Sequence, residues 1–288
     1  MRGGVPAAVA IVSVMSETTE HLVPGGLPAL AALATWGAVW RAGRCAPDDV
    51  VDALVDVAPA HRVVAADPDA AAVIDLTAAE VGTGALLRAI RQAARIRLLL
   101  PSPGDTLGLT GAALGDALDQ GQILVLWRSE DSDEAIGISA RTVATGSMSW
   151  TVRSLGSVIR LPDRDLGEAE FLMRETIRDA TAVLARLGGV ESAGTPVDLR
   201  TRLAAHTLAE TVDVPPQSGD RAIRVVGQTA QIAAILRVAV ELRPRTGLSA
   251  TGQDRADAAL DDLARSVRAA RMTALNAVVA ESDRSPRV

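Results

Sequence analysis

Apolar residues recur at helical spacing through most of the second half of the chain and in shorter stretches of the first half. The clearest case follows Asp165, where an apolar residue returns every three or four positions until Gly188, as in a helix with one buried face. Proline or glycine bounds most of these stretches, which is typical of helix ends. The pattern predicts helices at residues 28–42, 47–58, 84–94, 112–120, 166–187, 198–210, 221–242 and 254–281.

Shorter apolar runs in the first half predict β-strands. Residues 96–100 and 122–127 are almost continuously apolar, which is typical of strands that are buried on both faces. Two extended segments joined through Gly146 and Ser147 indicate a β-hairpin. A strand–helix–strand succession over residues 62–100 favours a βαβ unit with parallel strands. The expected strands are residues 62–66, 96–100, 122–127, 135–145 and 148–155.

All of the predicted strands precede the long helices. This separation predicts an α+β fold, in which a small mixed β-sheet with flanking helices is followed by a helical C-terminal half. We expect residues 25–160 to form the portion with the sheet, and residues 161–281 to form a helical portion packed on it as one compact unit. Residues 1–24 are expected to be a disordered extension, and residues 282–288 a polar tail.

The inventory of polar residues excludes several classes of chemistry. The chain is alanine-rich, carries a net charge of −6, and all 29 of its basic residues are arginine. Without lysine it lacks the amine of P-loop enzymes, kinases and Schiff-base enzymes, and arginine cannot act as a base in its place. A single cysteine, Cys45, excludes an intrachain disulfide and any cysteine-rich metal site. The three histidines are far apart, so the sequence predicts no metal site and no cofactor.

Charge and hydropathy also indicate the compartment. A mildly negative chain is not attracted to nucleic acid or to an acidic membrane. The apolar stretch at residues 27–40 is shorter than the roughly 20 residues that span a bilayer. We therefore expect a cytoplasmic protein that binds neither nucleic acid nor membrane.

The least generic segment is the loop Pro101-Ser-Pro-Gly-Asp-Thr-Leu-Gly-Leu-Thr-Gly111. It follows a buried strand and precedes a helix, which is where open α/β sheets place their ligands. Gly104, Gly108 and Gly111 permit close approach of a backbone, and Asp105 could accept a proton or a hydrogen bond. The alternative is a structural turn without a ligand.

Other polar residues are weaker candidates for a binding site. His61 precedes a strand, and Arg141 and Arg153 lie on the predicted hairpin, where they could form an anion-binding strip. The alternative for the arginines is an ordinary solvent-facing role, and for His61 a satisfied structural one. No arrangement of nucleophile and base is evident, so no catalytic residue is assigned.

The loop resembles one found in a family of uncharacterised actinobacterial proteins. Members of that family typically read Leu-Pro-x-Pro-Gly-Asp-Pro-x-Gly-Leu-x-Gly at this place, and Thr106 stands here where they carry proline. The resemblance extends to Leu166-Gly-Glu-Ala-Glu-Phe, Val214-Pro-Pro and Gln231-Ile-Ala-Ala-Ile-Leu, over most of residues 25–280. It implies an intracellular actinobacterial protein and no particular activity.

Two functional hypotheses follow from these observations. The first is a non-enzymatic interaction or regulatory protein, with a protein partner or a second copy of the chain on its apolar helices. The alternative is a small-molecule binder or enzyme that takes an anionic ligand at residues 101–111. Whether the protein is an enzyme stays open at this stage.

Overall fold

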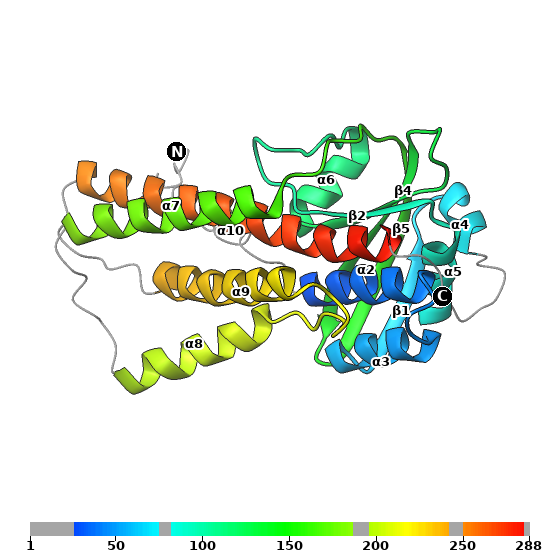
Figure 1. Cartoon of the computed structure of the whole chain (residues 1–288), viewed down its shortest axis with the longest axis horizontal. Helices are drawn as coiled ribbons and strands as arrows, with labels where there is room; N and C mark the ends of the chain where they lie inside the picture. The colour runs from blue at the N-terminus through cyan, green and yellow to red at the C-terminus, as the bar shows by residue number, and fades with distance from the viewer. Residues whose placement is uncertain (1–25, 75–81, 187–195, 242–249, 285–288) are drawn as a thin grey trace, which may run out of the picture.

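The computed structural model describes residues 26–74, 82–186, 196–241 and 250–284. The expected extension at residues 1–24 therefore lies outside the described residues, as do the end of the expected helix at 187 and most of the expected tail. The elements divide into a sheet half and a helical half (Figure 1). The sheet half contains α2 (Leu27–Arg41), α3 (Pro47–Val57), β1 (Ala60–Ala65), α4 (Pro68–Ile74), α5 (Thr83–Gln92), β2 (Arg95–Leu99), α6 (Gly111–Gln120), β3 (Ile123–Trp127), β4 (Glu134–Ala144) and β5 (Ser147–Ser157).

The five strands form one mixed sheet in the order β1-β5-β4-β3-β2. The expected hairpin is confirmed, because β4 and β5 pair antiparallel and are joined at Gly146, whose φ is +72°. The expected βαβ unit is wrong. β1 pairs parallel with β5, whereas β2 pairs antiparallel with β3, so the two strands lie at opposite edges and run in opposite directions. Apolar character predicted that β2 is buried, which is confirmed, but it carries no information on which strand pairs with which.

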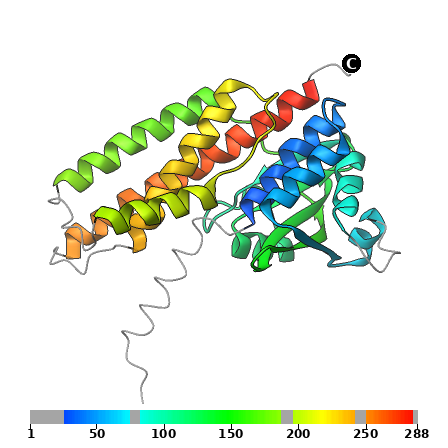
Figure 2. The same ribbon diagram turned by 90° about the horizontal axis from the view of Figure 1, so that it is seen from below.

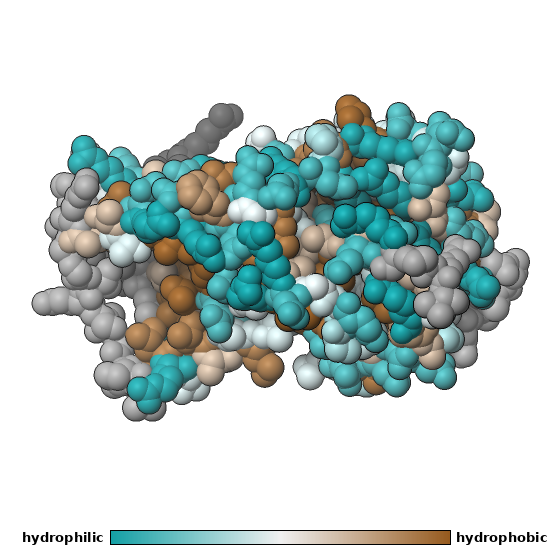
Figure 3. Space-filling model, in the orientation of Figure 1, coloured by the Kyte–Doolittle hydropathy of each residue, from teal (hydrophilic) through white to brown (hydrophobic). Residues whose placement is uncertain are grey.

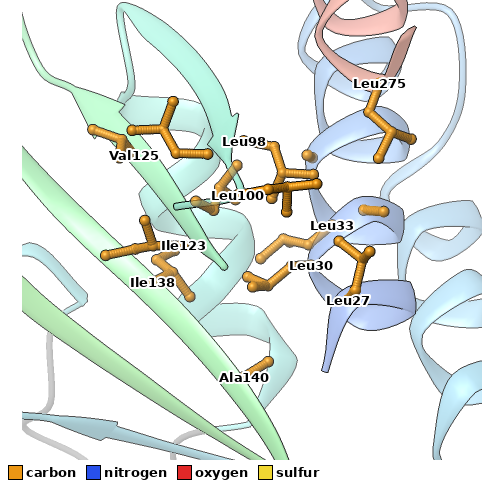
Figure 4. Close-up of a cluster of buried hydrophobic side chains, with 14 of the residues drawn as sticks. Leu27, Leu30, Leu33, Leu98, Leu100, Ile123, Val125, Ile138, Ala140 and Leu275 are labelled. Carbon is orange, nitrogen blue, oxygen red and sulfur yellow. The ribbon is translucent and has the colours of Figure 1, made fainter. Parts of the chain in front are cut away.

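Helix α2 forms the centre of the sheet half. Its apolar residues are buried all round, which is typical of a helix enclosed by its neighbours. Figure 4 shows Leu30 and Leu33 extending from α2 toward Leu98 and Leu100, with Leu275 of the last helix beside them. Leu30, Leu33 and Leu98 are fully buried. The N-terminus of α2 lies close to the sheet, since a side chain at Gly26 would collide with the carbonyl of residue 140.

The helical half consists of α7 (Leu166–Arg186), α8 (Pro196–Glu210), α9 (Asp220–Glu241) and α10 (Ala250–Arg284). Helix α10 packs against α7 and α9, and α8 packs against α9 (Figures 1 and 2). At 35 residues α10 is about 50 Å long, so it also reaches α2 and β2 in the sheet half. It continues through residues 282–284, which the sequence assigned to the tail, and Ser282 is buried there. The α+β architecture predicted from the sequence is confirmed.

Buried ion pairs join the helices of this half. Glu210, at the end of α8, accepts hydrogen bonds from Arg237 of α9 and Arg271 of α10, each at 2.7 Å. Glu210 and Arg271 are almost completely buried, and burial lowers the pKa of Arg271 while Glu210 opposes the change. A second buried carboxylate, Glu170 of α7, pairs with Arg174 and with Arg221 of α9. These contacts fix how the four helices are aligned.

Helix α9 is long and apolar enough to cross a membrane by length and composition alone. Its inward face is buried between neighbouring helices, and it carries the ion pair from Arg237 to Glu210. A core helix of a globular protein passes the same test, so this feature is weak evidence for a membrane span.

Candidate functional site

The loop predicted as a ligand site begins with a tight turn. The backbone N–H of Asp105 donates to the carbonyl of Ser102 at 2.8 Å, and the Ser102 N–H donates back to Asp105 at 3.0 Å. Gly104, with a φ of +85°, follows Pro103, which is the arrangement of a type II turn. Gly104 and Asp105 are both exposed, and the Asp105 carboxylate raises the pKa of Arg268 on α10, which burial lowers. This part of the loop thus faces solvent and α10.

The second part of the loop packs against the chain that follows β5. A side chain on Gly108 would lie 2.9 Å from the carbonyl oxygen of Ile159, so this position requires glycine for close approach as well as for its φ of +83°. Gly111, with a φ of +67°, begins α6. Leu107 and Leu109 are buried and anchor the loop.

His61 has a structural environment at the opposite edge of the sheet. The indole Nε1–H of Trp150 donates to His61 Nδ1 at 2.9 Å, so the neutral ring carries its proton on Nε2 and donates it to the Leu54 carbonyl at 3.1 Å. Burial lowers the pKa of His61, against the effect of the hydrogen bonds with backbone. Both ring nitrogens are therefore engaged within the fold.

The two candidate arginines are also separate from the loop. Arg153 of β5 forms an ion pair with Asp116 of α6, and Arg141 is exposed on β4. Sequence reasoning named seven candidate residues, and none of them lines the cavity described next.

A cavity of about 970 Å³ lies between the two halves, beside the edge strand β2. Its walls come from β2, the end of α2, the end of α5, the chain after β5, and the last turns of α10. Six arginines and four acidic residues line it. The arginines are Arg41, Arg91, Arg95, Arg97, Arg164 and Arg284, and the acids are Glu130, Asp163, Asp165 and Asp283.

The edge of β2 is held in place by the only asparagine of the chain. The Leu98 N–H donates to Asn276 Oδ1 at 2.9 Å, and Asn276 Nδ2 donates to the Leu98 carbonyl at 2.8 Å. The side chain from α10 thus occupies both backbone groups that Leu98 directs away from β3, which opposes pairing of this edge with another chain at that position. It also fixes the wall of the cavity relative to the sheet.

Arg97 is the most buried cation of the cavity, with a relative exposure of 8%. Its Nη atoms donate to the carbonyls of Leu161 and Pro162 and contact Asp163 at 3.2 Å, whereas its Nε has no hydrogen-bond partner. Burial lowers the pKa of Arg97, and the nearby Asp163 opposes that change. The carboxylate of Asp163 is also shared with Arg95 at 3.3 Å, so one largely exposed acid serves two cations.

The remaining acids of the cavity are already engaged. Asp283 pairs with Arg41, Asp165 accepts the Glu168 N–H at the start of α7, and Glu130 lies 3.8 Å from Arg160 outside the cavity. Within the part of the chain that the structure describes, the side chains of Arg91, in α5, and Arg164 have no hydrogen bond or ion pair. The cavity therefore carries a surplus of positive charge, although the whole chain is negative.

One feature of the sequence points to this cavity, although it was not among the predicted site residues. Arg95 and Arg97 alternate with apolar residues on a strand whose other positions are buried, so both arginines lie on the same face of the sheet. Arginine on a buried strand needs a counterion or a ligand. The other arginines come from segments far apart in the sequence, and no spacing links them.

Comparison with known proteins places the chain in a family. Residues 30–164 match the Rv1486c-like protein N-terminal domain, and residues 167–272 match the Rv1486c-like protein C-terminal domain. The chain belongs to the Rv1486c-like family. The two matched domains divide at the start of α7, where the sheet half gives way to the helical half. The cavity is lined by residues of the first match, by Met272 at the end of the second, and by the part of α10 that follows it.

Similar proteins occur in mycobacteria. The uncharacterised protein Rv1486c of Mycobacterium tuberculosis is 32% identical over 277 residues, covering 86% of this chain and 96% of that protein. The uncharacterised protein ML1804 of Mycobacterium leprae is 31% identical with the same coverage, and the uncharacterised protein MAV321 of Mycobacterium avium is 27% identical over 244 residues, covering 73% of this chain and 78% of that protein. No solved structure matches the chain. The predicted resemblance to an uncharacterised actinobacterial family is thereby confirmed.

Proposed function

We propose that the protein binds a small anionic molecule in the arginine-lined cavity beside β2. The observation that carries this proposal is the surplus of arginines around a cavity within the size range of small-molecule sites. The ligand would lie beside the 101–111 loop rather than in it, since Leu107 is the one residue of that loop in the lining.

The environment of Arg97 supports an anion as the ligand. The charge of the buried Arg97 guanidinium is only partly neutralised, because its nearest acid, Asp163, is exposed and also pairs with Arg95. A negative group in the cavity would neutralise the rest of that charge. Arg91 and Arg164 have fixed charges and hydrogen-bond donors available at the rim, and arginine binds carboxylates and phosphates in a bidentate manner.

Binding can be tested by calorimetric titration with inorganic phosphate, pyrophosphate and short carboxylates, on the wild type and on the double variant Arg91→Gln/Arg164→Gln. We expect the double variant to bind about tenfold more weakly, because two charge-assisted contacts are lost. Arg141→Gln is the matched control, because Arg141 is exposed and lies outside the cavity. If the double variant binds as tightly as Arg141→Gln, the cavity is not the binding site.

A second candidate function is protein interaction through the helical half. Leu208 of α8 is 78% exposed and Ile235 of α9 is 53% exposed, and Figure 3 shows apolar side chains gathered over these two helices around a hollow. A contiguous exposed apolar patch is typical of a surface that contacts another protein. Light scattering on the wild type and on Leu208→Ser/Ile235→Ser tests self-association, with Val55→Ser on α3 as the control. This function is excluded if two results are obtained together. The wild type stays monomeric in light scattering, and the immobilised wild type captures from cell extract only proteins that the immobilised variant also captures.

A further inference from the structure

We infer that the carboxylate of Asp163 holds the place of the ligand between Arg95 and Arg97, and that a carboxylate or phosphate group binds there by displacing it. This inference rests on the proposed function, because it names the subsite and the anionic group that the same cavity would take.

Two arginines of β2 form this subsite. Arg95 and Arg97 are two residues apart on one strand, so both side chains leave the same face of the sheet. The Oδ1 atom of Asp163 lies 3.2 Å from Arg97 Nη2, and its Oδ2 atom lies 3.3 Å from Arg95 Nη2. A carboxylate or phosphate of a ligand offers the same pair of oxygens to the two guanidinium groups.

The carboxylate of Glu210 provides an internal comparison, because its two oxygens are also bound by two different arginines. Both of those distances are 2.7 Å, and the Glu210 side chain is only 1% exposed. The distances at Asp163 exceed the roughly 2.7–2.9 Å of strong charge-assisted hydrogen bonds, and the Asp163 side chain is 59% exposed. Glu210 is therefore a fixed part of the fold, whereas Asp163 is held weakly.

The Asp163 side chain can turn outward while the backbone around it stays in place. Residues 158–165 connect β5 to α7 and form neither a helix nor a strand. Arg97 donates to the carbonyls of Leu161 and Pro162, and these contacts do not involve the carboxylate. Because most of the Asp163 side chain is already in contact with water, turning outward loses only two partly exposed ion pairs.

A ligand anion has further cations available that do not contact Asp163. Arg91 and Arg164 line the same cavity, and within the described residues their side chains have no hydrogen bond or ion pair. An anion with two negative charges is attracted to these arginines more strongly than an anion with one. We therefore expect phosphate to bind more tightly than acetate, with both anions displacing Asp163.

The variant Asp163→Asn tests the displacement directly. It removes the charge that competes for Arg95 and Arg97, and it retains the size of the side chain. Calorimetric titration of the full-length protein with inorganic phosphate and with acetate is expected to show about tenfold tighter binding by this variant than by the wild type.

Asp133→Asn is the matched control for the general effect of removing a negative charge. Asp133 is 62% exposed and lies 3.5 Å from Arg160, so its exposure and its pairing resemble those of Asp163, but it is outside the lining of the cavity. Its substitution should change the affinity for phosphate by less than about threefold, because water and salt screen an exposed charge.

The gain from Asp163→Asn should also depend on Arg95. In a protein that carries Arg95→Gln, Asp163 no longer competes for that arginine, so Asp163→Asn should improve phosphate binding by less than about threefold. A double-mutant cycle over the wild type, the two single variants and the double variant measures this dependence.

Each outcome decides between the two proposals. If Asp163→Asn binds phosphate no more tightly than the wild type or than Asp133→Asn, or if its full gain persists with Arg95→Gln, the inference of displacement is wrong and anion binding stands. If neither the wild type nor Asp163→Asn binds phosphate, pyrophosphate or acetate, both proposals are wrong.

Discussion

The two halves of this protein are held together by different forces. In the described part of residues 26–164, no carboxylate is buried, and the interior consists mainly of aliphatic side chains around α2 and the sheet, together with Trp127 and Trp150. In the helical half, the carboxylates of Glu170 and Glu210 are buried, and each is bound by two arginines. The sheet half is thus held together by the burial of apolar side chains, which has no preferred direction. The helical half combines such burial with ion pairs, which do have a preferred direction.

This difference has a physical reason. A sheet fixes the positions of its strands through backbone hydrogen bonds, so apolar side chains suffice to fill the space between sheet and helix. Helices satisfy their backbone internally and can slide or rotate against each other when their apolar faces are rich in alanine. A buried carboxylate between two arginines permits one alignment of α8, α9 and α10, because any other leaves a charge unpaired.

The largest effect is expected when the ion pair of the helical half is broken. Glu210→Gln removes the charge that compensates buried Arg271 and Arg237, and we expect the free energy of unfolding to fall by about 3–5 kcal/mol. Chemical denaturation measures this change. Glu175→Gln, in an exposed pair with Arg178, is the control and should cost less than about 1 kcal/mol. Equal losses in the two variants would contradict the role of Glu210.

A comparable test in the sheet half removes apolar volume. Leu30→Ala leaves a cavity between α2 and the sheet, and the expected loss in the free energy of unfolding is about 3 kcal/mol. Leu208→Ala makes the same chemical change at an exposed site in the helical half, where the loss should stay below about 0.5 kcal/mol. A small loss for Leu30→Ala would mean that α2 does not organise the core.

The contact between the two halves is tested at Asn276. Asn276→Ala leaves the N–H and carbonyl of Leu98 without their partners, and we expect a loss of about 2 kcal/mol. Hydrogen exchange at the Leu98 amide should become faster than in the wild type. The exposed Arg265→Ala, on the same helix, should leave that exchange rate unchanged. If Asn276→Ala also leaves it unchanged, the side chain does not protect the strand.

The smallest expected effect is a pH dependence in the sheet half. Because burial lowers the pKa of His61, the unfolded chain takes up the proton first as the pH falls below about 6.5, and the folded state loses stability. Urea denaturation at about pH 7.5 and about pH 5.5 should therefore give a smaller difference for His61→Gln than for the wild type. A larger difference for His61→Gln than for the wild type would reverse the assigned sign.

Much of the fold could be predicted from residue patterns. The start of α7 was predicted from Asp165, whose side chain accepts the Glu168 N–H as expected for a helix cap. The end of α6 was predicted at Gly121, which adopts the left-handed conformation. Such signals act within a few residues, so they locate elements well. The neighbours of β2 depend on contacts between distant segments, and this prediction failed.

The sequence therefore determined the helices other than α4, the hairpin and the absence of lysine chemistry, because each of these depends on local spacing or on composition. The tertiary structure alone decided the order of the strands, the partners of Glu210 and the cavity. Arg41, Arg97 and Arg284 belong to three different segments, and only the packing of α2, β2 and α10 brings their charges around one space. Electrostatic fields depend on distance in space, and a pattern along the chain does not contain that distance.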